Sequence, residues 1–281
     1  MNTSLILSDI YIYPVKSLGA IRVSQAEVEE RGLRFDRRWV VVDDTNRFVT
    51  QRQHPIMALI EVTLTDNGLE LRHRTRDLGV LIVPALPETL DLVPVTVWDD
   101  TIEAVVVNDA CNRWLTEALG FSVRLMYLPD TSPRLADTNY APFEVNVSFA
   151  DGFPFLLIGQ SSLDDLNTRL PDAVSMVRFR PNFVFEGGEP YDEDQWYEFT
   201  IGGTRFYGVK PCARCVLTTV DPEKGTISGK EPLRTLSTYR KRNNKIFFGQ
   251  NVVTQESGQI KVGDEVVVVS RKVRYTMSEG I

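Results

Sequence analysis

The N-terminal third of the chain shows the polar and apolar alternation of short β-strands. Apolar residues alternate in part with polar ones over residues 5–13, and this run ends at Pro14. Farther along, pairs of apolar runs flank short polar turns: 40–42 with 47–49, 58–64 with 68–73, and 95–97 with 101–107. The second pair is joined by Asn67-Gly68, a dipeptide typical of tight hairpin turns. The first 107 residues are therefore predicted to form an antiparallel β unit.

A helix is predicted directly after this β unit. Asn108 and Asp109 offer side chains that cap a helix N-terminus, and Gly120 suits the left-handed conformation that ends one. Between them, residues 110–119 place apolar side chains at near-helical spacing. The predicted buried stripe consists of Trp114, Leu115 and Leu119.

The rest of the chain returns to strands after a loop-like segment. Residues 129–147 contain stretches of Pro, Asp, Thr, Ser and Asn, so a linker is predicted there. Predicted strands follow at 154–158, 177–185, 196–201, 204–209, 216–220, 247, 252–253 and 265–269. A helix is predicted at 162–170, where Ser162 to Asp165 resembles a capping box, and another at 231–241.

These elements predict a mainly β protein with a few helices. The predicted segments are an N-terminal β domain (1–128), a linker (129–147), a second β domain (148–270) and a polar tail expected to fray (271–281). Alternation alone does not distinguish a barrel from a sandwich.

Composition narrows the class of protein and of partner. The 281 residues are 43% hydrophobic, enough for one large core or two modest ones. A net charge of −7 argues against nucleic acid as the main partner, because phosphate binding needs a basic face. No apolar run is long enough for a membrane span, and the N-terminus lacks the pattern of a signal peptide. Three cysteines make no disulfide framework, so we expect a reducing, cytoplasmic location.

Two of the three cysteines, Cys212 and Cys215, flank Arg214 near the C-terminus. A thiolate binds soft metals, and neighbouring positive charge lowers the pKa of a thiol. Either cysteine is therefore a candidate metal ligand or nucleophile. A zinc site usually needs four ligands, and the remaining sulfur or imidazole ligands are Cys111, His54 and His73. Both histidines lie in polar stretches without a visible partner cluster, so we expect them to be solvated.

Two other interpretations of the cysteine pair stay open at this point. A redox couple usually lies at a helix start, whereas the β-branched run 216–220 predicts a strand after the pair. Two inert, packed thiols would also satisfy the spacing. Glycine patterns of serine hydrolases, P-loops and dinucleotide-binding folds do not occur.

Longer motifs carry a family resemblance. The string Pro-Cys-Ala-Arg-Cys-Val-Leu-Thr-Thr-Val-Asp-Pro at 211–222 is similar to the signature of MOSC-domain molybdenum enzymes of the amidoxime-reducing (YcbX-like) type. Further similar blocks occur in family order at 13–17, 32–39, 148–155 with 179–182, and 248–251 with 260–264. The resemblance spans about residues 6–269, and it implies that an N-terminal antiparallel β domain packs on a C-terminal MOSC-type β-barrel.

The resemblance implies a molybdenum cofactor, in which a pyranopterin and one protein cysteine hold the metal. Cys215 matches the position of the family's metal ligand and is the expected catalytic and metal-binding residue. Soft thiolate ligation suits a metal that shuttles electrons. Cys212 matches a position that is not a ligand, and we expect it to be a packed thiol.

Matched positions also imply the cofactor-binding residues. Lys16, Arg37 and Arg180 are expected to contact phosphate and pterin, since lysine offers a point charge and arginine two parallel donors. Neighbouring cofactor-contacting positions are matched by Ser17, Gly152, Phe153, Asn182, Ala213 and Arg214. We expect these residues to line one pocket between the two β domains.

Three other charged residues, Arg38, Arg178 and Asp151, lie close to these positions in the sequence. Arg38 would point away from Arg37 in a strand, whereas Arg178 would share a face with Arg180. Asp151 is expected to orient an arginine, to cap a turn or to approach the metal.

The activity implied by the resemblance is the reduction of N-hydroxylated compounds, including hydroxylaminopurines, amidoximes and hydroxylamines. Some bacterial members carry a plant-type ferredoxin domain with a cysteine-rich motif. No such cysteines occur here, so we expect a separate electron donor: a flavoprotein, a ferredoxin or a cytochrome. Alternatives are a cofactor carrier or sulfur-transfer module, and a binding module without the metal.

Overall fold

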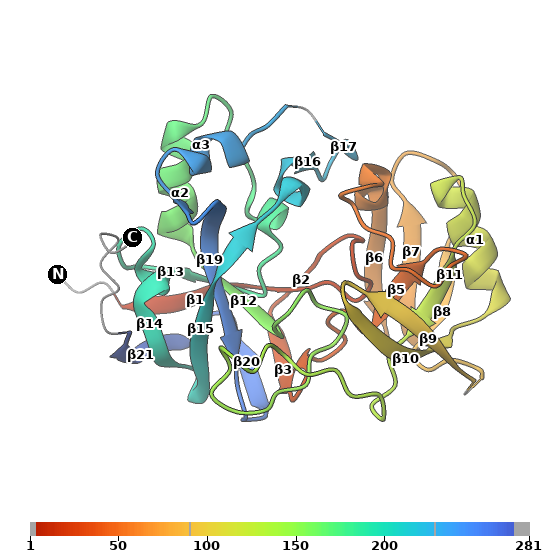
Figure 1. Cartoon of the computed structure of the whole chain (residues 1–281), viewed down its shortest axis with the longest axis horizontal. Coiled ribbons are helices and arrows are strands. Elements are labelled where there is room, and N and C mark those ends of the chain that lie inside the picture. The colour runs from red at the N-terminus through yellow and green to blue at the C-terminus, as the bar shows by residue number, and fades with distance from the viewer. Residues whose placement is uncertain (1–3, 90, 228, 273–281) are drawn as a thin grey trace.

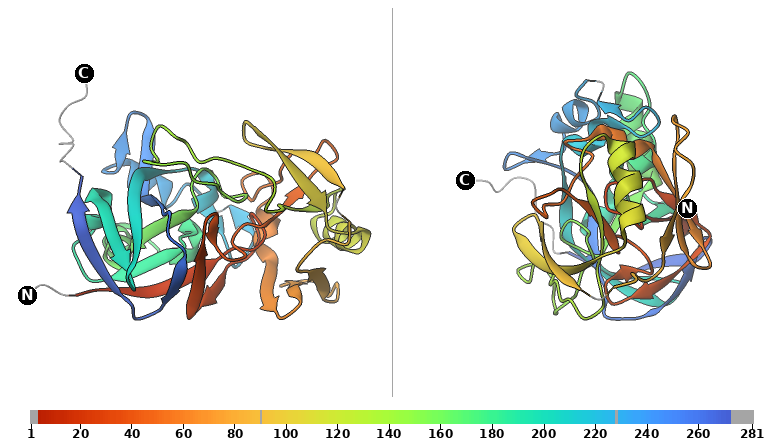
Figure 2. Two further views of the ribbon diagram at one scale, coloured as in Figure 1. Left: turned by 90° about the horizontal axis from the view of Figure 1, so that it is seen from below. Right: turned by 90° about the vertical axis from the view of Figure 1, so that its right-hand side faces the viewer.

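The computed structural model describes residues 4–89, 91–227 and 229–272, and these form two β-rich halves side by side (Figure 1). Strands hold 42% of the residues and helices 16%, so the predicted fold class is confirmed. One half is a closed barrel, and the other is built from two smaller antiparallel sheets and a helix (Figure 2). Within the described residues, no helix is long and apolar enough to span a membrane.

The barrel is a ring of seven strands. In spatial order they are β12 (Phe155–Gly159), β13 (Phe183–Glu186), β1 (Leu5–Ile12), β21 (Glu265–Arg271), β14 (Trp196–Ile201), β15 (Thr204–Arg214) and β19 (Lys245–Val253). Pairing of β19 with β12 closes the ring. All neighbours are antiparallel except β12 and β13. Buried aromatic side chains fill the interior: Phe155, Phe183, Phe185, Trp196, Phe199 and Phe206.

The most N-terminal strand belongs to this barrel. β1 lies between β13 and β21, with Leu5 opposite Val266 and Ile10 opposite Phe183. Its apolar side chains Leu7, Ile10 and Ile12 are buried in the barrel core, which explains the alternation seen in the sequence. After β1, Val15 and Leu18 pack in the core of the other half, and β2 (Ile21–Val23) then pairs back with β1 (Figure 1).

The other half contains two of the predicted antiparallel hairpins, 58–64 with 68–73 and 95–97 with 101–107; of the predicted pair 40–42 with 47–49, only an isolated bridge between Val42 and Phe48 forms. One sheet has the order β5 (Trp39–Val42), β11 (Arg124–Tyr127), β10 (Asp100–Val106) and β9 (Leu92–Val97). A second sheet consists of β6 (Ile60–Thr65), β7 (Gly68–His73) and β8 (Leu81–Pro84). Helix α1 (Asp109–Leu119) packs on both, and Asn108 caps it by accepting a hydrogen bond from the Cys111 amide at 2.9 Å. Gly120 ends the helix with φ of 81°, as predicted.

Smaller elements complete the described chain. The strands are β2 (Ile21–Val23), β3 (Gln25–Glu29), β4 (Gly32–Leu33), β16 (Val220–Asp221), β17 (Thr226–Ile227), β18 (Lys241–Arg242) and β20 (Gly258–Lys261). The helices are α2 (Gln160–Arg169) and α3 (Leu233–Ser237), and the 3₁₀ turns are η1 (Pro55–Leu59), η2 (Met176–Phe179), η3 (Asp192–Gln195) and η4 (Val216–Thr219). In the part of the chain that the structure describes, no strand lies between β11 and β12, the stretch that includes the predicted linker 129–147.

Two predicted strands are wrong over part of their length. Residues 216–219 form the 3₁₀ turn η4, where the Thr218 and Thr219 hydroxyls donate to backbone carbonyls three residues back. Such local side-chain bonds compete with strand pairing. Residues 176–179 form η2, and Arg180 ends it in a left-handed conformation, so only β13 remains of the strand predicted at 177–185.

Other local predictions are corrected as well. Helix α2 begins at Gln160, two residues before the predicted cap, and Ser162 bonds a buried glutamate instead of capping. Helix α3 is shorter than the predicted 231–241. His73 is buried, because its strand faces the core. Of the predicted tail, Arg271 still belongs to β21, and residues 273–281 lie outside the described residues.

The buried glutamate is Glu193, which is fully inaccessible in the barrel half. It accepts hydrogen bonds from the Gly159 amide at 3.2 Å and from the Ser162 hydroxyl at 2.9 Å, at the start of α2. Burial raises the pKa of Glu193 to about 7, and the nearby Asp194 adds to the rise. The protonated carboxyl is therefore the form that the fold favours.

We expect Glu193 to make the protein less stable as the pH rises. Because its folded pKa exceeds its ordinary value of 4.5, its contribution is complete below pH about 4.5 and is lost through pH about 7. That contribution is about 3 kcal/mol, since each pKa unit is about 1.4 kcal/mol. Urea unfolding at pH 5 and pH 8 should show a smaller pH difference in Glu193→Gln than in wild type. The exposed Glu189→Gln is the control and should keep the wild-type difference; an unchanged difference in Glu193→Gln would contradict this role.

Candidate functional site

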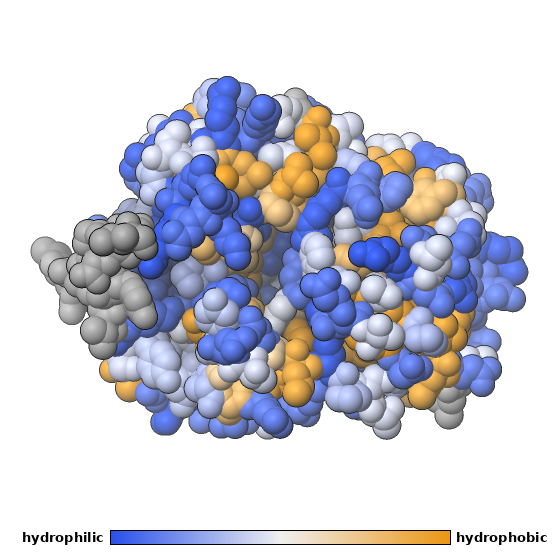
Figure 3. Space-filling model, viewed as in Figure 1, coloured by the Kyte–Doolittle hydropathy of each residue, from blue (hydrophilic) through white to orange (hydrophobic). Residues whose placement is uncertain are grey.

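A cavity of about 310 Å³ lies where the two halves meet, and all ten residues predicted for the cofactor site line it. They are Lys16, Ser17, Arg37, Gly152, Phe153, Arg180, Asn182, Ala213, Arg214 and Cys215. The molecule is hollowed near its middle in the space-filling view (Figure 3). The fold thus brings together segments that lie up to about two hundred residues apart, while the roles of these residues remain predictions.

Cys215 lies directly after β15, and its side chain is exposed toward this cavity. A register shift between Pro211 and Ala213 interrupts the pairing of β15 with β19. Such bulges redirect side chains at the ends of barrel strands. The Cys215 sulfur accepts a hydrogen bond from Arg52 Nε at 3.1 Å.

Cys212 has different surroundings. It is half-buried, packs against an apolar cluster, and accepts a hydrogen bond from Arg214 Nη1 at 3.0 Å. The packing predicted for this thiol is therefore present. The two thiols differ in access, and Cys215 is the more exposed of the two.

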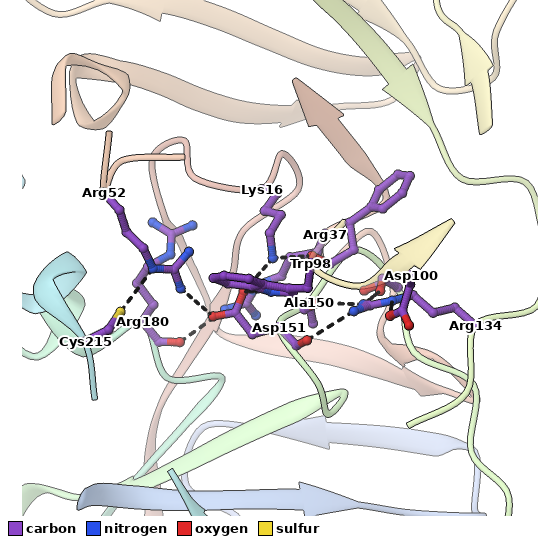
Figure 4. Close-up of polar contacts among 12 residues, drawn as sticks. Lys16, Arg37, Arg52, Trp98, Asp100, Arg134, Ala150, Asp151, Arg180 and Cys215 are labelled. Carbon is purple, nitrogen blue, oxygen red and sulfur yellow. Dashed lines mark hydrogen bonds and ion pairs between the residues drawn. The ribbon is translucent and has the colours of Figure 1, made fainter. Parts of the chain in front are cut away.

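A buried lysine and an aspartate form an ion pair in the lining of the cavity (Figure 4). Lys16 Nζ donates to Asp151 Oδ1 at 2.6 Å and to the Phe149 carbonyl at 2.7 Å. Burial lowers the pKa of Lys16 to about 8, although Asp151 opposes the shift. Burial would raise the pKa of Asp151, but the positive charges of Lys16 and Arg52 outweigh it and hold that pKa well below its usual range. Of the roles considered for Asp151, orienting an arginine is the one that these contacts display.

Two arginines lie over one buried tyrosine ring. The guanidinium carbons of Arg37 and Arg180 are 4.2 Å and 4.1 Å from the centroid of the Tyr13 ring. Arg37 Nη1 also pairs with Asp36 at 2.5 Å, and Arg180 Nη1 donates to the Leu18 carbonyl at 2.8 Å. Burial lowers the pKa of Arg180 to about 10, and the charge of Arg37 acts in the same direction.

Three of the cavity residues adopt left-handed backbone conformations. Ser17, Arg37 and Arg180 have φ of 68°, 51° and 56°. These conformations are strained for residues with a Cβ, and such strain gathers at functional sites. They also aim the side chains in directions that a regular strand would not allow.

The expected strand positions of Arg37, Arg38, Arg178 and Arg180 are wrong. Arg37 is not in a strand, because β5 begins only at Trp39. Arg38 is buried outside the cavity, where it donates to the Leu128 carbonyl and pairs with Asp130. Arg178 and Arg180 do not share a strand face, and Arg178 binds the Val220 carbonyl away from this cavity.

Of the remaining predicted residues, Asn182 and Arg214 form side-chain hydrogen bonds within the protein. The Asn182 side chain accepts from Arg37 and from the Leu156 amide, and it donates to the Tyr11 carbonyl. Arg214 Nη2 donates to the Phe179 carbonyl at 2.6 Å. Ser17, Gly152, Phe153 and Ala213 complete the lining.

Two further residues of the lining, Arg52 and Trp98, were not predicted from the sequence. Arg52 lies in the polar run Gln51-Arg52-Gln53, and Trp98 lies in a hairpin turn. Neither context differs from an ordinary surface. Asn251 of β19 also lines the cavity and was not predicted, although it lies in a matched motif.

The residues present fit an anionic, metal-bearing cofactor. Among the described residues, the buried Arg180 Nη2 and Arg214 Nε atoms have no hydrogen-bond partner. Such donors suit phosphate or pterin acceptors. The described residues contain no group of three or more metal-ligating side chains. Cys215 would supply the protein's thiolate.

Comparisons with known proteins agree with this architecture. Residues 4–122 match the family described as the MOSC N-terminal beta barrel domain, and residues 144–267 match the MOSC domain. Mitochondrial amidoxime-reducing component 1 of Mus musculus is 36% identical, covering 94% of this chain and 82% of that protein. The Homo sapiens protein of the same name is 37% identical, covering 94% of this chain and 83% of that protein. Mitochondrial amidoxime reducing component 2 of Rattus norvegicus is 35% identical, covering 92% of this chain and 82% of that protein. The chain therefore belongs to the MOSC-domain family that includes the mitochondrial amidoxime-reducing components.

Proposed function

We propose that this protein reduces N-hydroxylated compounds with a molybdenum–pyranopterin cofactor held in the cavity. The observation that carries the proposal is an accessible thiol, Cys215, in a cavity lined by cations, within a chain whose relatives are named amidoxime-reducing components. In the proposed reaction R–NHOH gains two electrons and two protons, the N–O bond breaks, and R–NH₂ and water leave. Amidoximes, hydroxylamines and hydroxylaminopurines share this N–OH group. A separate donor protein (a flavoprotein, a ferredoxin or a cytochrome) would supply the electrons.

The chain would hold the cofactor from two sides. Cys215 would ligate the metal, and Lys16, Arg37 and Arg180 would bind the phosphate and pterin. Smaller contacts would come from Ser17, Gly152, Phe153, Asn182, Ala213 and Arg214. When bound, the cofactor supplies the two-electron chemistry that removes the oxygen, and the protein supplies binding, orientation and charge.

The chain's own groups would divide the proton work. Asp151 stays ionised beside Lys16 and Arg52, so it would accept a hydrogen bond from the substrate and would not act as the acid. The Lys16 ammonium lies 2.6 Å from Asp151 and has a pKa of about 8, so it would be the proton donor of the site.

The test of this function begins with the purified protein. Produced in a host that makes the cofactor, it should contain about one molybdenum and one pterin per chain, and it should convert an amidoxime to the amidine with reduced methyl viologen. Bound molybdenum without turnover would indicate a cofactor carrier or sulfur-transfer module instead. Absence of both metal and pterin would reject the proposal.

A further inference from the structure

The contacts of Arg52 point to a role that neither the motifs nor the relatives assign. We propose that Arg52 is the positioning residue of this site, which fixes the Cys215 sulfur and the Asp151 carboxylate relative to each other. The inference rests on the proposed function for its catalytic meaning, but the geometry stands by itself. Arg52 comes from the N-terminal half just before η1, Cys215 follows the barrel strand β15, and Asp151 lies in the segment between β11 and β12 (Figure 4).

One guanidinium reaches both groups. Arg52 Nε donates to Cys215 Sγ at 3.1 Å, and Nη2 donates to Asp151 Oδ2 at 2.9 Å. Because the guanidinium is planar and rigid, two bonds from its donors set the spacing and direction of the two acceptors. A lysine has a single charged nitrogen and cannot hold this arrangement in the same way.

The guanidinium is itself held in place. It lies over the Trp98 ring at 4.5 Å, and Trp98 Nε1 donates to Asp151 Oδ1 at 3.3 Å, so these three side chains form a closed set of contacts. The backbone beside Arg52 is anchored as well, because the buried Gln51 side chain donates to the Ser17 carbonyl at 2.7 Å. The Arg52 side chain is only 17% exposed.

Charge explains why a cation is needed at this point. A thiolate at Cys215 and the ionised Asp151 would repel each other across the cavity. Lys16 compensates Asp151 from the other side, through its bond to Oδ1, whereas Arg52 donates both to Asp151 and to the sulfur. Arg52 therefore links the two anions, and partners of this kind orient metal ligands.

Kinetics of two variants test the positioning role. Arg52→Gln should lower kcat per bound molybdenum by about 10- to 100-fold, the usual cost of losing a partner of a metal ligand, with KM nearly unchanged. Arg52→Lys keeps the charge and should recover little of the loss. Arg74→Lys is the matched control. Arg74 lies in the same half as Arg52, forms ion pairs with Glu61 and Glu223, and does not line the cavity. This variant should behave as wild type. Full kcat in Arg52→Lys would overturn the proposal, because charge alone would then suffice.

A second readout does not depend on turnover. Crystal structures of wild type and Arg52→Gln should show the Asp151 carboxylate and the Cys215 side chain displaced or in several conformers in the variant alone. Unchanged positions of both side chains would overturn the positioning role. If wild type contains no molybdenum, the proposed function fails, and these structures still decide the question about Arg52.

Discussion

Cys215→Ser is expected to abolish the reduction of amidoximes. A serine hydroxyl is a harder ligand than a thiolate and remains protonated at neutral pH, so it cannot replace soft sulfur at a redox metal. The side chain is exposed toward the cavity, so this substitution should leave the thermal midpoint nearly unchanged. The measurement is the rate with reduced methyl viologen, together with the molybdenum content of the same sample.

Cys212→Ser is the matched control for this experiment. Cys212 is half-buried and accepts a hydrogen bond from Arg214, and a serine oxygen can accept the same bond. Most of the activity should therefore remain. Equal loss in both variants would indicate that the two cysteines act as a redox pair, and the ligand role of Cys215 would have to be abandoned.

Removal of Arg37 or Arg180 should release the cofactor. Truncating one partner of a buried, hydrogen-bonded charge pair typically costs about 2–5 kcal/mol. Because about 1.4 kcal/mol corresponds to one decade, Arg37→Ala and Arg180→Ala should each weaken cofactor binding by well over tenfold. Molybdenum per chain after dialysis measures the effect.

Two neighbouring arginines serve as controls. Arg38 is buried outside the cavity, so Arg38→Ala should lower the thermal midpoint while each folded chain keeps its molybdenum. Arg178→Ala should also keep the metal, since its side chain binds the Val220 carbonyl and Asp221. Full retention in Arg37→Ala and Arg180→Ala, or equal loss in Arg38→Ala, would contradict the site as described.

Motif similarity was enough to predict ten residues that line one cavity, but not the contacts that organise it. Lys16 and Cys215 stand in strings of specific composition, so their positions could be matched. Arg52 stands in a polar run like many on protein surfaces, and its partner Cys215 is 163 residues away. No local pattern reports such a distant contact, and only the assembled fold reveals it.

The strands of the hairpins could be predicted because their apolar and polar residues alternate as the buried and exposed positions do, as in β6 and β7. The turns beside the cavity were not. Thr218 and Thr219 are β-branched, which favours a strand, yet their hydroxyls bond the backbone and hold a 3₁₀ turn. Arg180 has a left-handed conformation that its residue type disfavours, and no propensity argument would have found it.

The position of β1 in the barrel has a consequence for how the chain folds during synthesis. Its partner β21 is the last strand of the described chain, with Leu5 opposite Val266, so the ring cannot close until β21 has left the ribosome. Contacts of such long sequence separation slow folding, and unpaired strand edges expose newborn chains to aggregation. Lys16 and Ser17 follow β1 by a few residues, so the binding cavity should be among the last of these parts to assemble, and a cofactor should be captured only after β21 has been synthesised.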